Sequence, residues 1–120
     1  MSQTTNKLGS WGEQRAAEHL EKLGYTIIAR NFRYGHGEID LVADDNGTLV
    51  FVEVKTQSSE AMGEAFNWVT QRKQRQIGRV ALAYLTANKI ENRDCRFDVI
   101  AVARREQEVE IKHIPNAFWL

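Results

Sequence analysis

The chain has 120 residues, and its formal charge is zero because 16 Lys and Arg residues balance 16 Asp and Glu residues. With 42% apolar residues and no net charge, it has the composition of a folded protein rather than a disordered one. One cysteine excludes an internal disulfide and a cysteine-built zinc site, and fits a reducing cytoplasm. No apolar run approaches the ~20 residues of a membrane-spanning helix. We therefore expect one cytoplasmic domain over residues 1–120, with no membrane partner and a flexible start over residues 1–8.

The hydrophobic pattern predicts two helices and five strands. Ser10 followed by Glu13 predicts a helix start with a capping box, and Gly24 predicts the end of that helix. Asn46-Gly47, between two β-prone runs, is the strongest hairpin signal in the chain. In chain order, the predicted elements are a helix over residues 10–23, strands over 25–32, 38–43 and 48–56, a helix over 70–88, and strands over 96–103 and 109–114.

The order α-β-β-β-α-β-β predicts an α/β fold, with a mixed central sheet of about five strands flanked by helices. A helix connects the third and fourth strands, so these two should be parallel and joined by a right-handed crossover. The apolar residues 117–120 should pack against the sheet or meet a partner.

The charges in the central hairpin carry the strongest functional signal. A two-residue turn at Asn46-Gly47 would set Asp40 opposite Glu53 and Glu38 opposite Lys55. Two opposed carboxylates repel each other unless a divalent cation binds between them, and carboxylate oxygens are ligands that Mg²⁺ prefers. Lys55 would project beside such a metal and could orient a water or stabilise charge on a phosphate. The alternative is a solvated hairpin face with a surface ion pair between Glu38 and Lys55.

Two further charges fall on the inner faces of the predicted helices. Glu13 lies on the apolar stripe of the first helix, and Lys73 precedes Ile77 by one helical turn. The stripe that we expect to be buried consists of Ala16, Ala17, Leu20 and Leu23. A capping role for Glu13 and a snorkelling side chain for Lys73 are the alternatives. Together with the hairpin acids, these two charges suggest one polar site between helices and sheet.

A basic stripe follows the second helix. Arg72, Arg75 and Arg79 lie on one side of it, where they could contact phosphates, and Arg33 could extend that surface. The alternative is an ordinary solvated face. Elsewhere, Asp98 lies among apolar residues, which favours a structural hydrogen-bonding role, and the three histidines show no metal-ligand spacing.

These residues resemble the PD-(D/E)XK nuclease superfamily, whose signature is an acid on one strand and (D/E)-X-K on the next. Asp40 and Glu53-Val54-Lys55 match it, and Glu13 matches the helix glutamate common in that superfamily. More closely, the chain resembles the YraN family of small bacterial proteins from about Leu8 to Phe118. The matching segments include Gly12-Glu13, Arg30-Asn31, Gly37-Glu38-Ile39-Asp40-Leu41, Phe51-Val52-Glu53-Val54-Lys55-Thr56, Lys73-Gln74 and Arg96-Phe97-Asp98-Val99. Gln57 departs from the pattern, because the family usually has arginine there.

The resemblance implies a restriction endonuclease-like fold and a metal-dependent nuclease related to Holliday-junction resolvases. Asp40 and Glu53 would hold Mg²⁺ or Mn²⁺ with the Val54 carbonyl and Glu13, and Lys55 would position the attacking water. The substrate implied is DNA, and a homodimer is possible by analogy with the resolvases. Lys73, Arg72, Arg75, Arg79 and Arg33 would meet its backbone. A nucleic-acid-binding module without turnover and a protein-interaction module are the alternatives.

Overall fold

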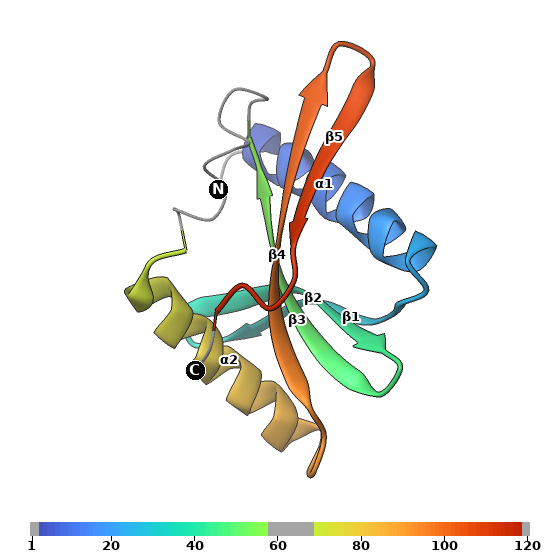
Figure 1. Ribbon diagram of the computed structural model, residues 1–120. Coiled ribbons are helices and arrows are strands. Elements are labelled where there is room, and N and C mark those ends of the chain that lie inside the picture. Colours follow the sequence, from blue (N-terminus) through green and yellow to red (C-terminus); the bar gives the residue numbers. More distant parts are fainter. Residues whose placement is uncertain (1–2, 58–68, 119–120) are drawn as a thin grey trace.

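The computed structural model describes residues 3–57 and 69–118, and its elements follow the predicted order (Figure 1). They are α1 (Gln3–Lys22), β1 (Thr26–Tyr34), β2 (Gly37–Asp45), β3 (Thr48–Thr56), α2 (Gln71–Ala87), β4 (Cys95–Arg105) and β5 (Glu108–Ile114). The mixed α/β fold class with five strands is therefore confirmed.

The five strands form one sheet in the order β1-β2-β3-β4-β5. Strands β3 and β4 are parallel, as the helical crossover predicts, and the other neighbours are antiparallel. Asn46 and Gly47 both have positive φ, at 50° and 99°, as a two-residue hairpin turn requires. The turn sets the β2–β3 register from Asp45–Thr48 to Leu41–Val52, which is the register that the sequence predicts.

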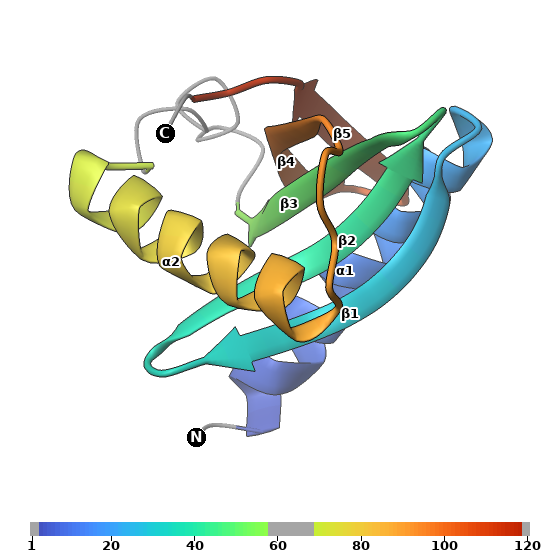
Figure 2. The same cartoon turned by 90° about the horizontal axis from the view of Figure 1, so that it is seen from below.

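The two helices cover opposite faces of the sheet (Figure 2). Helix α2 packs on β1 and β2 and buries Ile77, Val80, Ala81 and Tyr84. Helix α1 packs chiefly on β3 and buries a second apolar stripe on the other face. Thr70 caps α2 by accepting a hydrogen bond from the backbone N–H of Lys73. Each face of the sheet thus has its own apolar core, and each helix packs on the sheet through one of these cores.

Two predictions about α1 are wrong. The helix begins at Gln3, so Ser10 lies inside it and does not form the N-cap of a capping box with Glu13. Leu23, expected on the buried stripe, is 54% exposed just after the helix ends. Of the start predicted to be flexible, residues 1–2 lie outside the described part of the chain, and the backbone from Gln3 onward is helical.

The segment after β5 folds back over the sheet. Ala117 donates its backbone N–H to the Phe97 carbonyl at 2.7 Å, and Phe118 stacks on the Phe97 ring. Both residues are buried, which confirms the predicted packing for 117–118, whereas 119–120 lie outside the described residues. Within the described residues, no helix is long and apolar enough to cross a membrane.

Candidate functional site

The regular alternation of β2 is broken at Asp40. Ile39 and Val42 pack in the same core, beneath α2, although three positions separate them. In β1, Asn31 lies between the pairs Arg30–Leu41 and Phe32–Ile39 and has a φ of 53°. Asparagine tolerates this left-handed conformation better than most residues. The residues on either side of Asp40, Ile39 and Leu41, therefore pack in different cores and do not share one face, as strict alternation would require.

Asp40 bonds the neighbouring strand directly. Its Oδ2 accepts the backbone N–H of Val54 at 2.7 Å, beyond the last ladder pair, Leu41–Val52. The carboxylate thus replaces a backbone carbonyl at the point where the β2–β3 ladder ends. This bond joins Asp40 of β2 to the residue that follows Glu53 on β3. It uses the backbone N–H of Val54, whereas the predicted metal ligand is the Val54 carbonyl.

Glu13 reaches the same place from α1, because Gly12 lets the helix approach β3 closely. A Cβ atom built on Gly12 would lie 2.0 Å from the Thr56 Oγ1 atom. Any side chain at position 12 would therefore push α1 away from the sheet. Glu13 is half-buried beside this contact, and its carboxylate receives a hydrogen bond from the Asn31 side chain.

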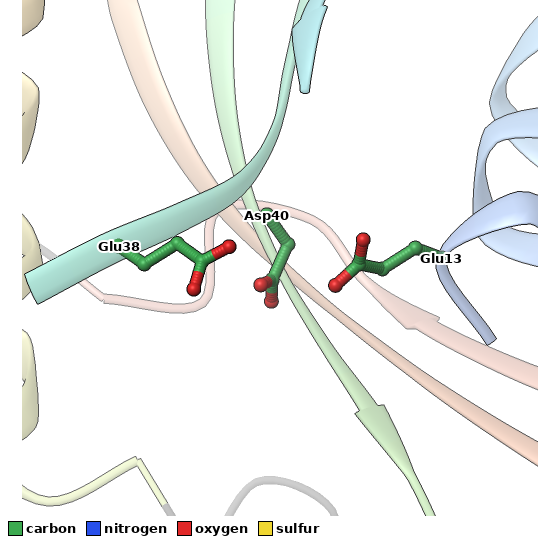
Figure 3. A group of neighbouring side chains, drawn as sticks. All are labelled: Glu13, Glu38 and Asp40. Atoms are coloured by element: carbon green, nitrogen blue, oxygen red, sulfur yellow. The ribbon is translucent and has the colours of Figure 1, made fainter. Parts of the chain in front are cut away.

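Three carboxylates converge at this point, from Glu13, Glu38 and Asp40 (Figure 3). One oxygen from each lies within 4.8 Å of the others, and the figure shows Asp40 between the two glutamates. Glu38 also pairs with Arg33 at 3.6 Å. Among residues 3–57 and 69–118 this is the one group of three or more acidic, His or Cys side chains that is compact enough to share a cation.

Glu53 lies behind this group on β3 and is only 6% exposed. Its Oε2 meets the Lys73 ammonium at 3.8 Å, and its Oε1 has no hydrogen-bond partner among the residues that the structure describes. A buried carboxylate oxygen without a partner is costly and uncommon in native proteins. The prediction that Lys73 faces inward toward the acids is therefore confirmed by this contact.

The electrostatics of the site resist ionisation of its acids. Burial raises the pKa of Asp40 to about 7, and the neighbouring Glu13 and Glu38 add to the rise, although the Val54 N–H opposes it. Burial, followed by the charge of Asp40, raises the pKa of Glu53 well above its usual range. Burial also raises the pKa of Glu13. A divalent cation would reverse this cost, since it stabilises the ionised forms.

The chemistry of the donor set fits a hard cation. The candidate side-chain ligands are all carboxylates, and the candidate backbone ligand is a carbonyl oxygen; such oxygen donors suit Mg²⁺ and Mn²⁺ better than softer metals. The unpartnered Oε1 of Glu53 and the mutually close oxygens of the other acids are the observations that favour such an ion. We take Glu13, Glu38, Asp40 and Glu53 together as the acidic cluster.

Two of the predicted basic residues contact the acidic cluster, Lys73 at Glu53 and Arg33 at Glu38, whereas the three arginines of α2 form no ion pair with it among those that the structure describes. Arg72, Arg75 and Arg79 are exposed, and Arg72 and Arg79 line a cavity of about 470 Å³ with His36. Lys55 is exposed two residues beyond Glu53, and its side chain is not one of the three in Figure 3. Of the predicted site residues, the structure thus brings Glu13 and Asp40 together, with Glu53 nearby. Lys55 and the arginines of α2 are exposed and are not members of this group.

A second polar network surrounds Asp98, which is fully buried. Its carboxylate accepts hydrogen bonds from Arg96 Nε at 2.9 Å, the Asn116 backbone N–H at 2.9 Å, and His113 Nε2 at 2.8 Å. Burial alone would raise its pKa, but these donors hold it below the usual range. The predicted structural role of Asp98 is confirmed.

The histidines are less scattered than the sequence indicates. His19 Nε2 lies 3.3 Å from His113 Nδ1, although the two residues are 94 positions apart. This contact ties α1 to β5 and continues the Asp98 network. The sequence showed no metal-ligand spacing among the histidines, and their spacing gave no sign of this contact.

The sequence pattern of the uncharacterised protein family UPF0102 matches residues 12–102, a range that includes the whole acidic cluster and α2. This chain belongs to the UPF0102 family. It is 51% identical over 115 residues to a UPF0102 protein of Trichlorobacter lovleyi, covering 94% of this chain and 91% of that relative. A UPF0102 protein of Geobacter metallireducens is 48% identical over 120 residues, covering 100% and 98%. The predicted resemblance to the YraN family is confirmed by this membership.

Sequence reasoning on this UPF0102 protein missed two residues of the site. Glu38 was expected as a partner of Lys55 or as a solvated acid, yet it lies within the group of three carboxylates. Asn31 was not assigned to the site, although it has a positive φ between the strand pairs that flank Asp40 and its side chain hydrogen-bonds Glu13. An asparagine inside a β-prone run is the available signal, because it favours irregular backbone.

Proposed function

We propose that this UPF0102 protein is a metal-dependent nuclease that hydrolyses phosphodiester bonds of nucleic acid, with DNA as the favoured substrate. The observation that carries the proposal is the acidic cluster itself. Three carboxylates share one small volume, and beside them a buried glutamate keeps an oxygen without a partner among the described residues. An arrangement that costs stability in the metal-free protein is typical of a site completed by a ligand.

The resemblance to PD-(D/E)XK nucleases supports the reaction class. Asp40 on β2 and Glu53-Val54-Lys55 on β3 stand in the order of that signature, and the Asp40–Val54 hydrogen bond joins its two halves. The α-β-β-β-α-β-β order is also the one that the restriction endonuclease-like expectation requires.

The acidic cluster would hold one or two Mg²⁺ or Mn²⁺ ions, with the Val54 carbonyl as a further candidate ligand. Such an ion supplies Lewis-acid polarisation of the phosphate and a more acidic bound water. Asp40, Glu53 and Glu13 bind and orient this ion, and Glu38 is added to that set by its position. Lys55 orients the attacking water and stabilises negative charge that develops on the phosphate.

The nucleic-acid backbone would meet the basic residues of α2. Arg72, Arg75 and Arg79 are exposed on this helix, and Lys73 lies between them and Glu53. Helix α2 has four cationic side chains and no acidic one over its 17 residues, although the whole chain is neutral. Arg33, which pairs with Glu38, would link this surface to the acidic cluster.

A second candidate is a nucleic-acid-binding protein without turnover. The charge of α2 favours it, because that surface does not depend on the acidic cluster. The two candidates differ in what the acids do, so a test of metal binding and cleavage separates them.

The test is a cleavage assay on labelled duplex, single-stranded and four-way-junction DNA, with Mn²⁺, Mg²⁺ or a chelator. We expect cleavage of at least one substrate with Mn²⁺ and none with the chelator. Glu53→Gln and Lys55→Ala should reduce the rate by at least about 100-fold, in line with the loss of a charge-stabilising group. Glu21→Gln, on the exposed side of α1, is the matched control and should leave the rate unchanged.

Calorimetric titration with Mn²⁺ gives a second, independent measurement. The wild-type protein should bind the ion, and Glu53→Gln and Asp40→Asn should weaken the binding strongly. Metal binding without cleavage of any of the three DNAs would favour the binding protein over the nuclease. Neither binding nor cleavage would remove both the site and the reaction.

A further inference from the structure

Two adjoining hollows lie on the α2 side of the β1–β2 hairpin, each with a volume of about 470 Å³. They adjoin at Tyr34 and Arg79, which line both, and we call the two hollows together the α2 groove. Figure 2 shows α2 crossing over β1 and β2. The residues that line the groove come from α2 and from the β1–β2 hairpin. Its remaining lining residues that matter here are His36, Arg72, Phe32 and Leu82.

The two ends of the α2 groove differ in chemistry. The first end has two cationic side chains, Arg72 and Arg79, with His36 beside them. The second end is apolar and aromatic, with Phe32, Tyr34 and Leu82. Tyr34 is 58% exposed and Leu82 is 65% exposed, so this end presents two large, accessible side chains around one hollow.

The groove is built by the close approach of the hairpin to α2. A Cβ atom on Gly37 would lie 2.5 Å from the Val80 Cγ2 atom, so only glycine fits between the turn and the helix. Gln76 Nε2 donates to the His36 carbonyl at 3.2 Å and ties the turn down from the same helix. The position of Tyr34 and His36 relative to the arginines is therefore held by packing rather than left to a loose loop.

The first end of the α2 groove and the acidic cluster use neighbouring residues of the β1–β2 hairpin. Gly37 lines the first end, and the next residue, Glu38, is one of the three converging carboxylates.

We infer that the α2 groove binds an unpaired nucleotide, with its phosphate at Arg72 and Arg79 and its base against Tyr34 and Leu82. This inference rests on the proposed function for its choice of nucleic acid, and it names the substrate class as single-stranded or branched DNA. Guanidinium groups match phosphate geometry, and exposed aromatic rings stack on bases. In a duplex the faces of the bases are covered by their neighbours, so a base can reach Tyr34 only where the strand is unpaired.

The experiment measures binding of two labelled DNAs by fluorescence anisotropy, with a chelator present so that nothing is cleaved. One DNA is a short single strand of mixed sequence, and the other is the same sequence closed into a blunt hairpin duplex. We expect Tyr34→Ala to weaken single-strand binding by roughly 5- to 150-fold, the range of base stacking on an aromatic ring. Binding to the duplex should stay the same. Tyr34→Phe should bind the single strand as the wild type does, because it keeps the ring.

Arginine and leucine variants test the two ends of the groove separately. Arg79→Gln should weaken binding to both DNAs and lower the slope of log affinity against log salt by about 1. Leu82→Ala should weaken single-strand binding alone. Leu23→Ala removes another exposed leucine, at the end of α1, and is the control that should change nothing.

The outcomes separate this inference from the nuclease proposal. Equal effects of Tyr34→Ala on single strand and duplex, or no effect on either, would overturn the inference even if the protein cleaves DNA. Selective loss of single-strand binding would support it even if no cleavage is found. Sedimentation of the same variants covers one other occupant: if Tyr34→Ala and Leu82→Ala dissociate a dimer and leave DNA binding unchanged, a second copy of the chain fills the groove and the inference is wrong.

Discussion

Glu53 and Asp98 are buried carboxylates on neighbouring parallel strands, yet their surroundings are opposite. In the β3–β4 register, Val52 lies beside Asp98 and Glu53 beside Val99, so the two acids face opposite sides of the sheet. Asp98 accepts hydrogen bonds from Arg96, His113 and the Asn116 backbone, and its pKa is lowered despite its burial. Glu53 keeps an oxygen without a partner among the described residues, and burial raises its pKa.

The difference comes from what each strand neighbour supplies. Asp98 has a guanidinium two residues away on its own strand and an imidazole from β5, and both are held by further contacts. Glu53 faces the carboxylate of Asp40, and it meets Lys73 only at 3.8 Å. A buried acid that accepts hydrogen bonds from nearby donors is typical of a structural role, whereas a buried acid placed beside other acids is typical of a ligand-binding site.

The largest expected effect comes from Asp98. Asp98→Ala leaves Arg96 and His113 without their common acceptor inside the protein, so the free energy of unfolding should fall by about 3–5 kcal/mol. Glu53→Gln keeps the shape of the side chain and removes a costly charge, so the free energy of unfolding should stay the same or rise. Urea denaturation of the metal-free proteins at neutral pH measures both.

The control for this pair is Asp94→Ala, which removes an exposed acid just before β4. It should change the free energy of unfolding by no more than about 0.5 kcal/mol. If Glu53→Gln destabilised the metal-free protein as much as Asp98→Ala does, Glu53 would be a structural acid, and the contrast between the two strands would disappear.

Rising pH should change the free energy of unfolding in opposite directions through the acids of the acidic cluster and through Asp98. The pKa of Asp40 rises from 3.8 to about 7 on folding, so between these pH values the folded state holds a proton that the unfolded state has released. Stability of the metal-free protein should therefore fall as the pH rises from about 4 to 7, by on the order of 2 to 4 kcal/mol. Glu53 acts in the same direction. Asp98, with a lowered pKa, contributes stability that is lost only as the pH falls below its usual range.

Thermal unfolding with a chelator over the pH range measures this slope. The double variant Asp40→Asn/Glu53→Gln should flatten the decline between pH 4 and 7 and leave the acid side unchanged. Mg²⁺ should stabilise the wild type clearly at pH 8 and weakly at pH 5, because carboxylate ligands must be ionised. A wild-type protein that is more stable at pH 8 than at pH 5 without metal would contradict the raised pKa values.

Much of the fold could be predicted because its signals are local. The apolar spacing of α2, the β-rich run of β3 and the Asn46-Gly47 turn each depend on neighbouring residues, and β3 has the predicted bounds, Thr48–Thr56. The start of α1 was missed because residues 3–9 carry little apolar periodicity, so nothing in that stretch marks a helix.

The site could be predicted only in part. Asp40 and Glu53 follow from the hairpin register, and Glu13 from its helix face. Glu38 was not assigned to the site because the extended hairpin register paired it with Lys55, whereas the ladder ends at Leu41–Val52 and Glu38 lies with Glu13 and Asp40. The distance between α1 and the strands depends on a contact between Gly12 and Thr56, which are far apart in sequence. No pattern among neighbouring residues in the sequence predicts that distance.

The smallest expected effect tests that contact, with two glycines of the same helix. Gly12→Ala would place its Cβ 2.0 Å from the Thr56 Oγ1 atom, so α1 must shift and the free energy of unfolding should fall by about 1–3 kcal/mol. Gly9→Ala has nothing within 4 Å of the new Cβ and should raise the free energy of unfolding by about 0.5–1 kcal/mol, as alanine does inside helices. Urea denaturation measures both.

Metal affinity shows whether the shift of α1 reaches the acidic cluster. Gly12→Ala moves the residue that precedes Glu13, so Mn²⁺ should bind more weakly, whereas Gly9→Ala should leave Mn²⁺ binding unchanged. The double variant Gly12→Ala/Thr56→Ala removes the clashing hydroxyl and should recover part of both losses. If Gly12→Ala lowered stability without weakening Mn²⁺ binding, Glu13 would not be a ligand, and the cation would depend on the acids of β2 and β3 alone.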